Sequence, residues 1–181
     1  PASMKFCTQC GKSRDHVIPP DDNRPRHVCT SCGHIHYLNP KIIAGCLPVF
    51  EDRVLLCQRA IEPRLGLWTL PAGFMENGET IAEGALREMH EEANAVGVEP
   101  SLYTVFSLPH ISQVYMFFRT TLNPPTFSAG SESLDVKLFT EDEIPWDELA
   151  FPVIPRTLEH FFADRTSRQF PLHTEDIRFK R

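Results

Sequence analysis

The chain has 181 residues, of which 41% are hydrophobic and 23% charged, so it suits one globular domain with a small appendage. No apolar run approaches membrane-spanning length, and we expect no membrane partner. The formal net charge of −6 argues against broad binding to nucleic-acid backbones, because that binding needs a surplus of Lys and Arg. The start, "PASMKFC", lacks the features of a secretory signal or a transit peptide, and we expect a cytoplasmic protein.

The first element along the chain is a pair of C-x2-C motifs, "CTQC" and "CTSC", with eighteen residues between them. This spacing is typical of a four-thiolate zinc site, with Cys7, Cys10, Cys29 and Cys32 as ligands. Two disulfides are the alternative, but disulfides suit an oxidising compartment, which no secretion signal supports. The segment 4–38 has too few apolar residues for a core of its own, so we predict a small domain held together by Zn²⁺.

After Pro40 the pattern changes, and we predict a second domain over 39–165. "KIIAGCLPVF" and "RVLLCQRA" predict two strands joined by a tight turn. "LWTLPAGFMENGE" predicts a short strand that runs into a Gly-rich loop. "TIAEGALREMHEEANAV" repeats apolar residues at the helical period, with Val96 on the apolar stripe. Thr80 and Glu83 predict a capping box at the start of this helix.

Beyond that helix the chain alternates again between strands and loops. "SLYTVFSL" and "SQVYMFFRTTL" predict strands, "PPTFSAGSES" a loop, "LDVKLF" a strand and "IPRTLEHFFADR" a closing helix with Pro155 in its first turn. Residues 166–181 are predicted as a C-terminal tail. The order of these elements predicts an α/β or α+β sheet with helices packed on it.

The helix that starts near Thr80 crowds Glu88, Glu91 and Glu92 into an arc of about 100° beside its apolar stripe. Without a ligand this arrangement is unfavourable, because like charges repel at i,i+4 spacing and the helix dipole disfavours acids in the C-terminal half of a helix. A divalent cation reverses both effects, since Mg²⁺ and Mn²⁺ prefer oxygen ligands. Gly84, one turn earlier, costs about 1 kcal/mol relative to alanine, which indicates that a close approach is needed there. Taken alone, the pattern leaves open both a metal site and a solvated acidic face.

The loop before the helix extends this pattern into a longer motif. The matching positions are Gly73, Glu79, Arg87, Glu88, Glu91 and Glu92. Their spacing resembles the Nudix box, G-x5-E-x7-R-E-U-x-E-E-x-G-U, and Asn94 stands where that pattern has its last glycine. Asparagine tolerates the left-handed conformation best after glycine, so we interpret Asn94 as a structural variation that leaves the acids intact.

The likeness continues outside the box, from Phe6 to about Phe162. The cysteine pairs in front, "YLNPK" at the junction and "LFTEDEIPW" late in the chain resemble the zinc-ribbon Nudix pyrophosphatases. Among these, the sequence is most similar to the plastid-type FAD/ADP-ribose pyrophosphatases of plants. The resemblance implies a Nudix fold: an α/β/α sandwich around a mixed sheet, preceded by a small zinc ribbon.

The resemblance also implies a set of site residues. One to three Mg²⁺ (or Mn²⁺) ions would be held by the Gly73 carbonyl and by four acids: Glu88, Glu91, Glu92 and Glu132. For the last of these, Asp135 is the alternative. Arg87 would orient Glu79 and the neighbouring acids. Glu91 and then Glu132 are the candidates for the general base, although a metal-bound water needs little help in losing its proton.

The implied substrates are FAD and ADP-ribose, which would be split to release AMP. The region after the box reads "SLPHISQVYMFF" and lacks the S-Q-P-W-P-F-P-x-S motif of NADH pyrophosphatases, so NADH would be a poorer substrate. Arg59, Phe106, His110 and Tyr115 are candidates for contacting phosphate or stacking on adenine. In each case the alternative is a strand residue that faces the core or solvent.

Two other classes of function remain open from the sequence. An enzyme for capped or NAD-ended RNA would be marked by a basic channel, and the sequence has no basic run. A non-catalytic nucleotide sensor would be marked by a lost metal-binding acid, and none is lost. We expect a small nucleotide derivative as the ligand and no nucleic-acid partner. Homodimers are common in the family, so a homodimer is also expected.

Overall fold

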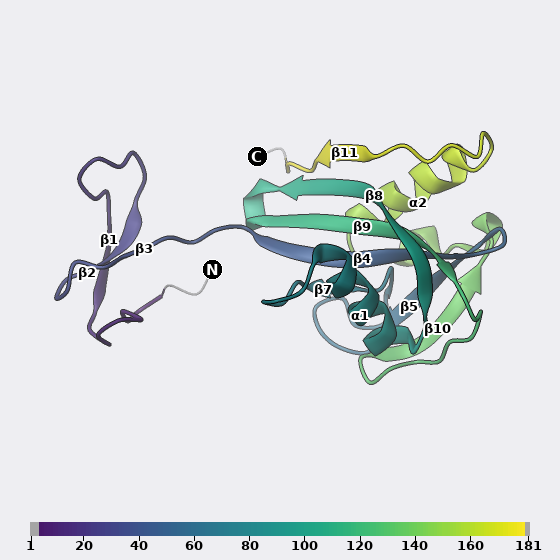
Figure 1. The fold of residues 1–181 in the computed structure, drawn as a ribbon, viewed down its shortest axis with the longest axis horizontal. Coiled ribbons are helices and arrows are strands. Elements are labelled where there is room, and N and C mark those ends of the chain that lie inside the picture. Colours follow the sequence, from purple (N-terminus) through teal and green to yellow (C-terminus); the bar gives the residue numbers. More distant parts are fainter. Residues whose placement is uncertain (1–3, 180–181) are drawn as a thin grey trace. The chain divides into compact units, whose positions relative to one another are not determined.

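The computed structural model describes residues 4–179, which divide into two compact units with the boundary between Asn39 and Pro40 (Figure 1). The first unit is a three-stranded antiparallel sheet with the strand order β1-β2-β3. Its strands are β1 (Arg14–Val17), β2 (Arg26–Cys29) and β3 (Ile35–His36). Within residues 4–179, no helix has the length and apolar character needed to cross a membrane.

The second unit is built on a mixed sheet with the strand order β10-β5-β4-β9-β8-β11, in which β6 pairs with β5 and β7 with β4. The pairs β4–β9 and β8–β11 are parallel and the others are antiparallel. The strands are β4 (Lys41–Phe50), β5 (Arg53–Arg59), β6 (Trp68–Thr69), β7 (Ala72–Phe74), β8 (Gly97–Leu108), β9 (Gln113–Leu122), β10 (Ser133–Phe139) and β11 (His173–Asp176).

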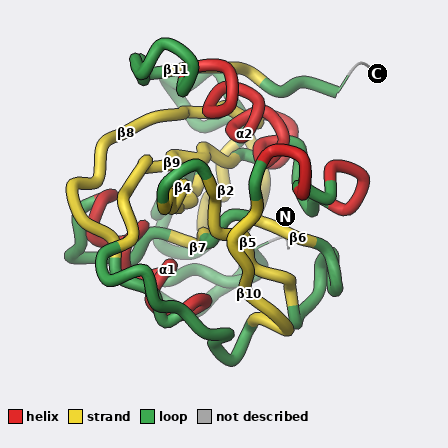
Figure 2. The backbone as a smooth tube through the Cα atoms, turned by 90° about the vertical axis from the view of Figure 1, so that its right-hand side faces the viewer, coloured by secondary structure: helices red, strands yellow, loops and turns green. Residues whose placement is uncertain are grey.

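Two α-helices cover opposite faces of this sheet, and the strands lie between them (Figures 1 and 2). The helices are α1 (Ile81–Ala93) and α2 (Val153–Asp164), and three short 3-10 helices span Pro109–Ile111, Glu141–Glu143 and Trp146–Glu148. Successive residues of β4 point to opposite faces, so Cys46 packs with α1 and Leu47 with α2. The predicted α/β/α sandwich is confirmed.

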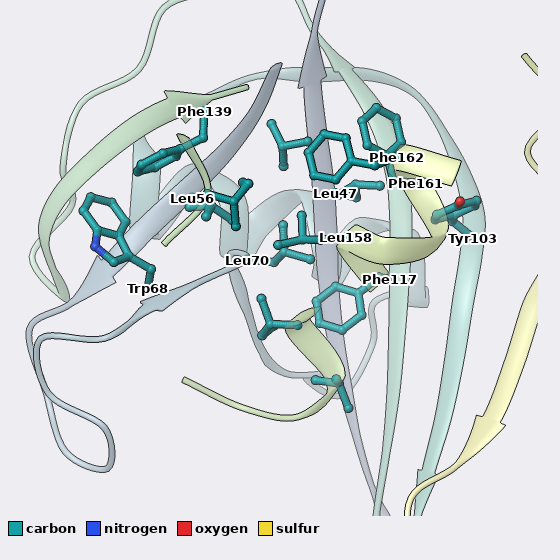
Figure 3. Close-up of a cluster of buried hydrophobic side chains, with 14 of the residues drawn as sticks. Leu47, Leu56, Trp68, Leu70, Tyr103, Phe117, Phe139, Leu158, Phe161 and Phe162 are labelled. Carbon is teal, nitrogen blue, oxygen red and sulfur yellow. The ribbon is translucent and has the colours of Figure 1, made fainter. Parts of the chain in front are cut away.

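The larger core cluster lies between the sheet and α2. Figure 3 shows Leu47, Leu56 and Leu70 facing Leu158 and Phe161 of α2. The smaller cluster lies beneath α1 and combines larger side chains such as Met89 and Phe118 with alanines of the helix and of β4. Small residues let α1 lie close to β4 and β7, and this close packing brings the acidic edge of the helix against the sheet.

The helix α1 begins where the sequence predicts, but it ends earlier than predicted. Thr80 is the N-cap: its side chain accepts from the Glu83 amide, and the Glu83 side chain accepts from the Thr80 amide, as the capping box predicts. The helix ends at Ala93, so Val96, which we expected on the apolar stripe, lies outside it and is 48% exposed. The chain turns at Asn94 because that residue is left-handed, with φ 46° and ψ 34°.

The segment predicted as a C-terminal tail, 166–181, contributes a strand to the sheet. In it, β11 pairs in parallel with β8, placing His173 opposite Thr104. Asp164, the last residue of α2, links this segment to the helix and the helix to β8: His173 Nε2 lies 2.6 Å from Asp164 Oδ2, and the Tyr103 hydroxyl donates to the same oxygen at 2.6 Å. The interpretation of this segment as a tail is therefore wrong, because the edge of β8 needs a partner that period-2 patterning does not reveal.

We predict that Asp164→Ala loosens this segment. The substitution leaves the hydroxyl of Tyr103, a residue only 1% exposed, without its acceptor, which should lower the free energy of unfolding by about 1–3 kcal/mol. Urea denaturation measures the change. Glu159→Ala is the control, because Glu159 pairs with Arg156 on the exposed surface and should change stability by less than about 0.5 kcal/mol. Equal effects of the two substitutions would contradict the anchoring role of Asp164.

Candidate active site

The acids of α1 are held together by one guanidinium. Arg87 donates through Nε and Nη2 to the two carboxylate oxygens of Glu79, both at 2.9 Å, and through Nη1 to Glu88 at 2.8 Å and Glu91 at 3.2 Å. The forked bond from Arg87, together with the Glu76 amide, lowers the pKa of Glu79 to about 2. The loop before α1 is therefore tied to the helix through charge.

Two glycines make room for these carboxylates. A Cβ placed on Gly73 would lie 2.3 Å from the carboxylate of Glu88, and one placed on Gly84 would lie 2.6 Å from Oε1 of Glu79. Neither position can hold a side chain without displacing an acid. The close approach that Gly84 indicated in the sequence is confirmed, and its partner is Glu79.

Glu92 and Glu88 face inward from the helix. Glu92 is only 9% exposed, and its Oε2 accepts a hydrogen bond from the Ala72 amide at 3.3 Å. Burial, followed by the nearby charge of Glu88, raises the pKa of Glu92 to about 8, and burial also raises the pKa of Glu88. Two largely buried carboxylates whose charges repel each other are unfavourable without a cation, so this part of the helix fits a divalent metal ion.

A fifth acid reaches the same place from the loop before β10. The backbone carbonyl of Glu132 accepts from the Ala60 amide at 2.9 Å, and Glu132 lines the same cavity as Glu88 and Glu92. Asp135 lies on β10, where it accepts from the Val136 amide and pairs with Lys137 at 3.3 Å. The geometry favours Glu132 over Asp135 as the added acid.

The cavity beside these acids has a volume of about 670 Å³, a size typical of small-molecule sites. Of the predicted substrate residues, Arg59, His110 and Tyr115 line it. Arg59 donates to the Pro63 carbonyl at 2.7 Å. Phe106 does not line the cavity: it has no exposed surface and belongs to the core cluster beneath α2, so a role in substrate contact is wrong for it.

The four cysteines of the first unit converge, with all their Sγ atoms within 4.8 Å of one another. Cys7 and Cys32 are 3.7 Å apart at sulfur, and Cys10 and Cys29 are 3.5 Å apart. Four sulfurs at 2.3 Å from a tetrahedral Zn²⁺ would be about 3.8 Å apart, whereas a disulfide needs about 2.05 Å. Amides of the C-x2-C turn donate to the Cys29 sulfur and lower the pKa of that thiol to about 6. The cluster thus fits a metal better than disulfides.

Comparison with known families decides which group of proteins this architecture represents. Residues 39–161 match the model of the NUDIX domain, and residues 5–38 match a zinc-ribbon model described as Nudix N-terminal. The chain belongs to the Nudix family. The resemblance seen in the sequence is therefore confirmed for both parts of the chain.

Several relatives share this Nudix domain. A crystal structure of a NUDIX hydrolase from Nitrosomonas europaea superposes with a TM-score of 0.92 at 54% identity, covering 96% of this chain and 99% of that one. NAD-capped RNA hydrolase NudC of Vibrio vulnificus (strain CMCP6) is 33% identical over 150 residues, which are 79% of this chain and 53% of that protein. The ADP-ribose pyrophosphatase of Methanocaldococcus jannaschii is 29% identical over 121 residues, 64% of this chain and 69% of that protein. The chain thus spans about half the length of the Vibrio protein.

Sequence reasoning missed the apolar wall of the Nudix-domain cavity. Phe74, Ile111, Phe151 and Phe179 line it, and the rings of His110 and Phe179 meet edge to face with centroids 4.5 Å apart. Phe74 could have been found, because it follows Gly73 at the start of the box. Phe179 could not, because its position depends on the pairing of β11 with β8.

We predict that Gly84→Ala separates stability from activity. Alanine gains about 1 kcal/mol of helix propensity, which offsets part of the stability lost when the new methyl group displaces Glu79 from Arg87, so the thermal midpoint should change little. Hydrolysis should fall by at least about ten-fold, since small displacements of site groups have effects of that size. Gly66→Ala is the matched control: it adds a methyl in open space at φ +82°, so stability should fall while hydrolysis is kept. Full activity in Gly84→Ala would contradict the need for close approach.

Proposed function

We propose that the protein hydrolyses the pyrophosphate bond of nucleoside diphosphate derivatives, with ADP-ribose and FAD as its substrates and AMP as the shared product. The observation that carries this proposal is the single cavity lined both by the box acids Glu88 and Glu92 and by aromatic side chains. Acids that gather cations suit a pyrophosphate, and flat apolar rings suit a nucleobase. Family membership supports the reaction class, and the finer choice of substrate rests on the sequence resemblance.

The acids of the Nudix box fit Mg²⁺ or Mn²⁺. The proposed ligands are the carbonyl of Gly73 and the carboxylates of Glu88, Glu91, Glu92 and Glu132. All are hard oxygen donors, and the strain between Glu88 and Glu92 would be relieved by a cation. When bound, the metal polarises phosphate oxygens and lowers the pKa of an attacking water.

The other groups of the site would orient the metal ligands or take the proton from the attacking water. Arg87 donates hydrogen bonds to Glu79 and to Glu88, and Glu88 lies against Gly73. We therefore assign Arg87 and Glu79 to orienting the metal ligands. Glu91 is the first candidate for the general base, because its side chain is 57% exposed and would be accessible to a water while Arg87 orients it. Glu132 is the second candidate.

Substrate contacts are proposed for residues that line the cavity. Arg59, whose charge lowers the pKa of Glu92, would contact a phosphate. His110 and Tyr115, joined by the newly found Phe179, offer ring surfaces for adenine. Phe179 is 68% exposed, which leaves ring surface available for such a contact.

NAD(H), including NAD-capped RNA, is the second candidate substrate, and the match to the Vibrio NAD-capped RNA hydrolase NudC supports the RNA form. The retained acids of the box count against the third possibility, a non-catalytic sensor. A homodimer and a cytoplasmic location stay predictions.

The proposed reaction is tested by incubating the protein with Mg²⁺ and FAD, ADP-ribose, NADH, NAD⁺ and diadenosine polyphosphates, and identifying the products by chromatography. We expect AMP from ADP-ribose and FAD, with less from NADH. Glu91→Gln and Glu92→Gln should each lower release by more than about a hundred-fold, the scale of losing one preorganised charged group. Glu159→Gln on α2 is the control and should keep full activity. If no substrate releases AMP, the hydrolytic proposal fails.

For the zinc ribbon we propose one structural Zn²⁺ bound by Cys7, Cys10, Cys29 and Cys32. Protein purified without chelator should contain about one zinc per chain by elemental analysis, because thiolates at this spacing bind zinc tightly. Cys29→Ser should lose the metal, whereas Cys57→Ser, a buried cysteine of the sheet, should keep it. Much less than one zinc per chain in the wild-type protein would contradict this site.

A further inference from the structure

Asn94, the one position that departs from the Nudix box, has a side chain that does more than tolerate a turn. The residue ends α1 in a left-handed conformation, and its backbone amide donates to the His90 carbonyl at 2.8 Å. A glycine would provide this conformation equally well. The asparagine side chain therefore needs a separate explanation.

That side chain reaches the loop before β10. Nδ2 of Asn94 donates to the carbonyl of Ser128 at 3.2 Å and to its Oγ at 3.1 Å. Two loop amides bond to the helix end beside it: Ser128 donates to the Ala93 carbonyl and Gly130 to the Glu92 carbonyl, both at 2.9 Å. The loop thus satisfies carbonyls that the last turn of a helix leaves without partners.

The loop is also pressed against the helix. A Cβ placed on Gly130 would lie 1.8 Å from the carbonyl oxygen of Glu91, so this position requires the absence of a side chain. Glu132 follows two residues later, its backbone carbonyl held by the Ala60 amide at 2.9 Å. The same contacts that dock the loop on the end of α1 therefore set where Glu132 enters the cavity.

We propose that Asn94 is a positioning residue that docks the loop 128–132 on α1 and so presents Glu132 to the active site. The inference rests on the proposed function, in which Glu132 serves the reaction. It assigns Asn94 a task that the glycine of the Nudix box cannot perform, because glycine has no side-chain donor. Glu132 comes from a loop rather than from the helix, so it is the acid that needs such a tether.

A double-mutant cycle tests the proposal, using Asn94→Gly, Glu132→Gln and the two together. Glycine keeps the left-handed turn, so the fold is retained and only the tether is lost. Asn94→Gly should lower kcat by about two- to ten-fold with KM little changed, the effect of losing one hydrogen-bonding group. Because Asn94 acts through Glu132, the double variant should be no slower than Glu132→Gln alone.

Two further variants test how far activity depends on each hydrogen bond between Asn94 and Ser128. Ser128→Ala removes one acceptor and leaves the backbone carbonyl, so its effect should be smaller than that of Asn94→Gly. Asn94→Asp keeps the size and the turn but cannot donate, so it should be at least as impaired as Asn94→Gly. Hydrogen exchange of the Ser128 and Gly130 amides should quicken in Asn94→Gly, while exchange of Leu47 in the core stays unchanged.

The outcomes separate this inference from the proposed function. Full activity in Glu132→Gln would overturn the role of Glu132 and, with it, the inference. An impaired Glu132→Gln beside a fully active Asn94→Gly would overturn the inference alone. Additive losses in the double variant would do the same, because they would mean that Asn94 acts on something other than Glu132.

Discussion

The arrangement of the second unit depends on one electrostatic constraint: several carboxylates share one edge of α1, and a single guanidinium lies among three of them. Arg87 joins Glu79 in the loop to Glu88 and Glu91 on the helix. Glu92 lies deeper, where burial and Glu88 raise its pKa. Such a cluster is costly in the absence of a cation, and this cost supports the proposal that the acids bind one.

The fold makes room for this cluster by packing α1 closely on the sheet and by placing glycines beside the carboxylates. α1 packs on β4 and β7 through small side chains, and Gly73 and Gly84 leave the space that two carboxylates occupy. At the other end of the helix, Gly130 and Asn94 let the loop before β10 lie directly on the last turn. Loop contacts thus flank the acidic edge at both ends of the helix, and Glu88 and Glu92 of this edge line the cavity.

The sequence predicted most of this where the signal is local. The C-x2-C pairs, the capping box at Thr80, the spacing of the acids and the apolar runs of β4 and β5 all depend on neighbours within a few residues. The confirmed elements belong to this group. Gly84 is the clearest case, because its cost to the helix indicated a close approach and the structure places Glu79 there.

The sequence failed where distant pairing decides the structure. The strand β11 forms only because β8 offers a parallel edge, so neither the strand nor the place of Phe179 at the cavity has a local signal. The prediction that Phe106 contacts the substrate failed for a related reason. The register of β8 against β9 shifts between Val98 and Ser101 and again between Leu102 and Thr104, so simple alternation along the strand does not fix which side chains face the core.

A Mn²⁺ titration followed by electron paramagnetic resonance measures whether the crowded acids of α1 form a cation site. With the cysteine cluster saturated with zinc, the wild-type protein should bind at least about one Mn²⁺ per chain in a saturable manner. Binding should weaken by at least about ten-fold in Glu88→Gln and Glu92→Gln, the loss expected from removing one charged ligand, and stay unchanged in Asp147→Asn. Saturable binding that survives both glutamine variants, or no saturable binding in the wild-type protein, would contradict a cation site at these acids.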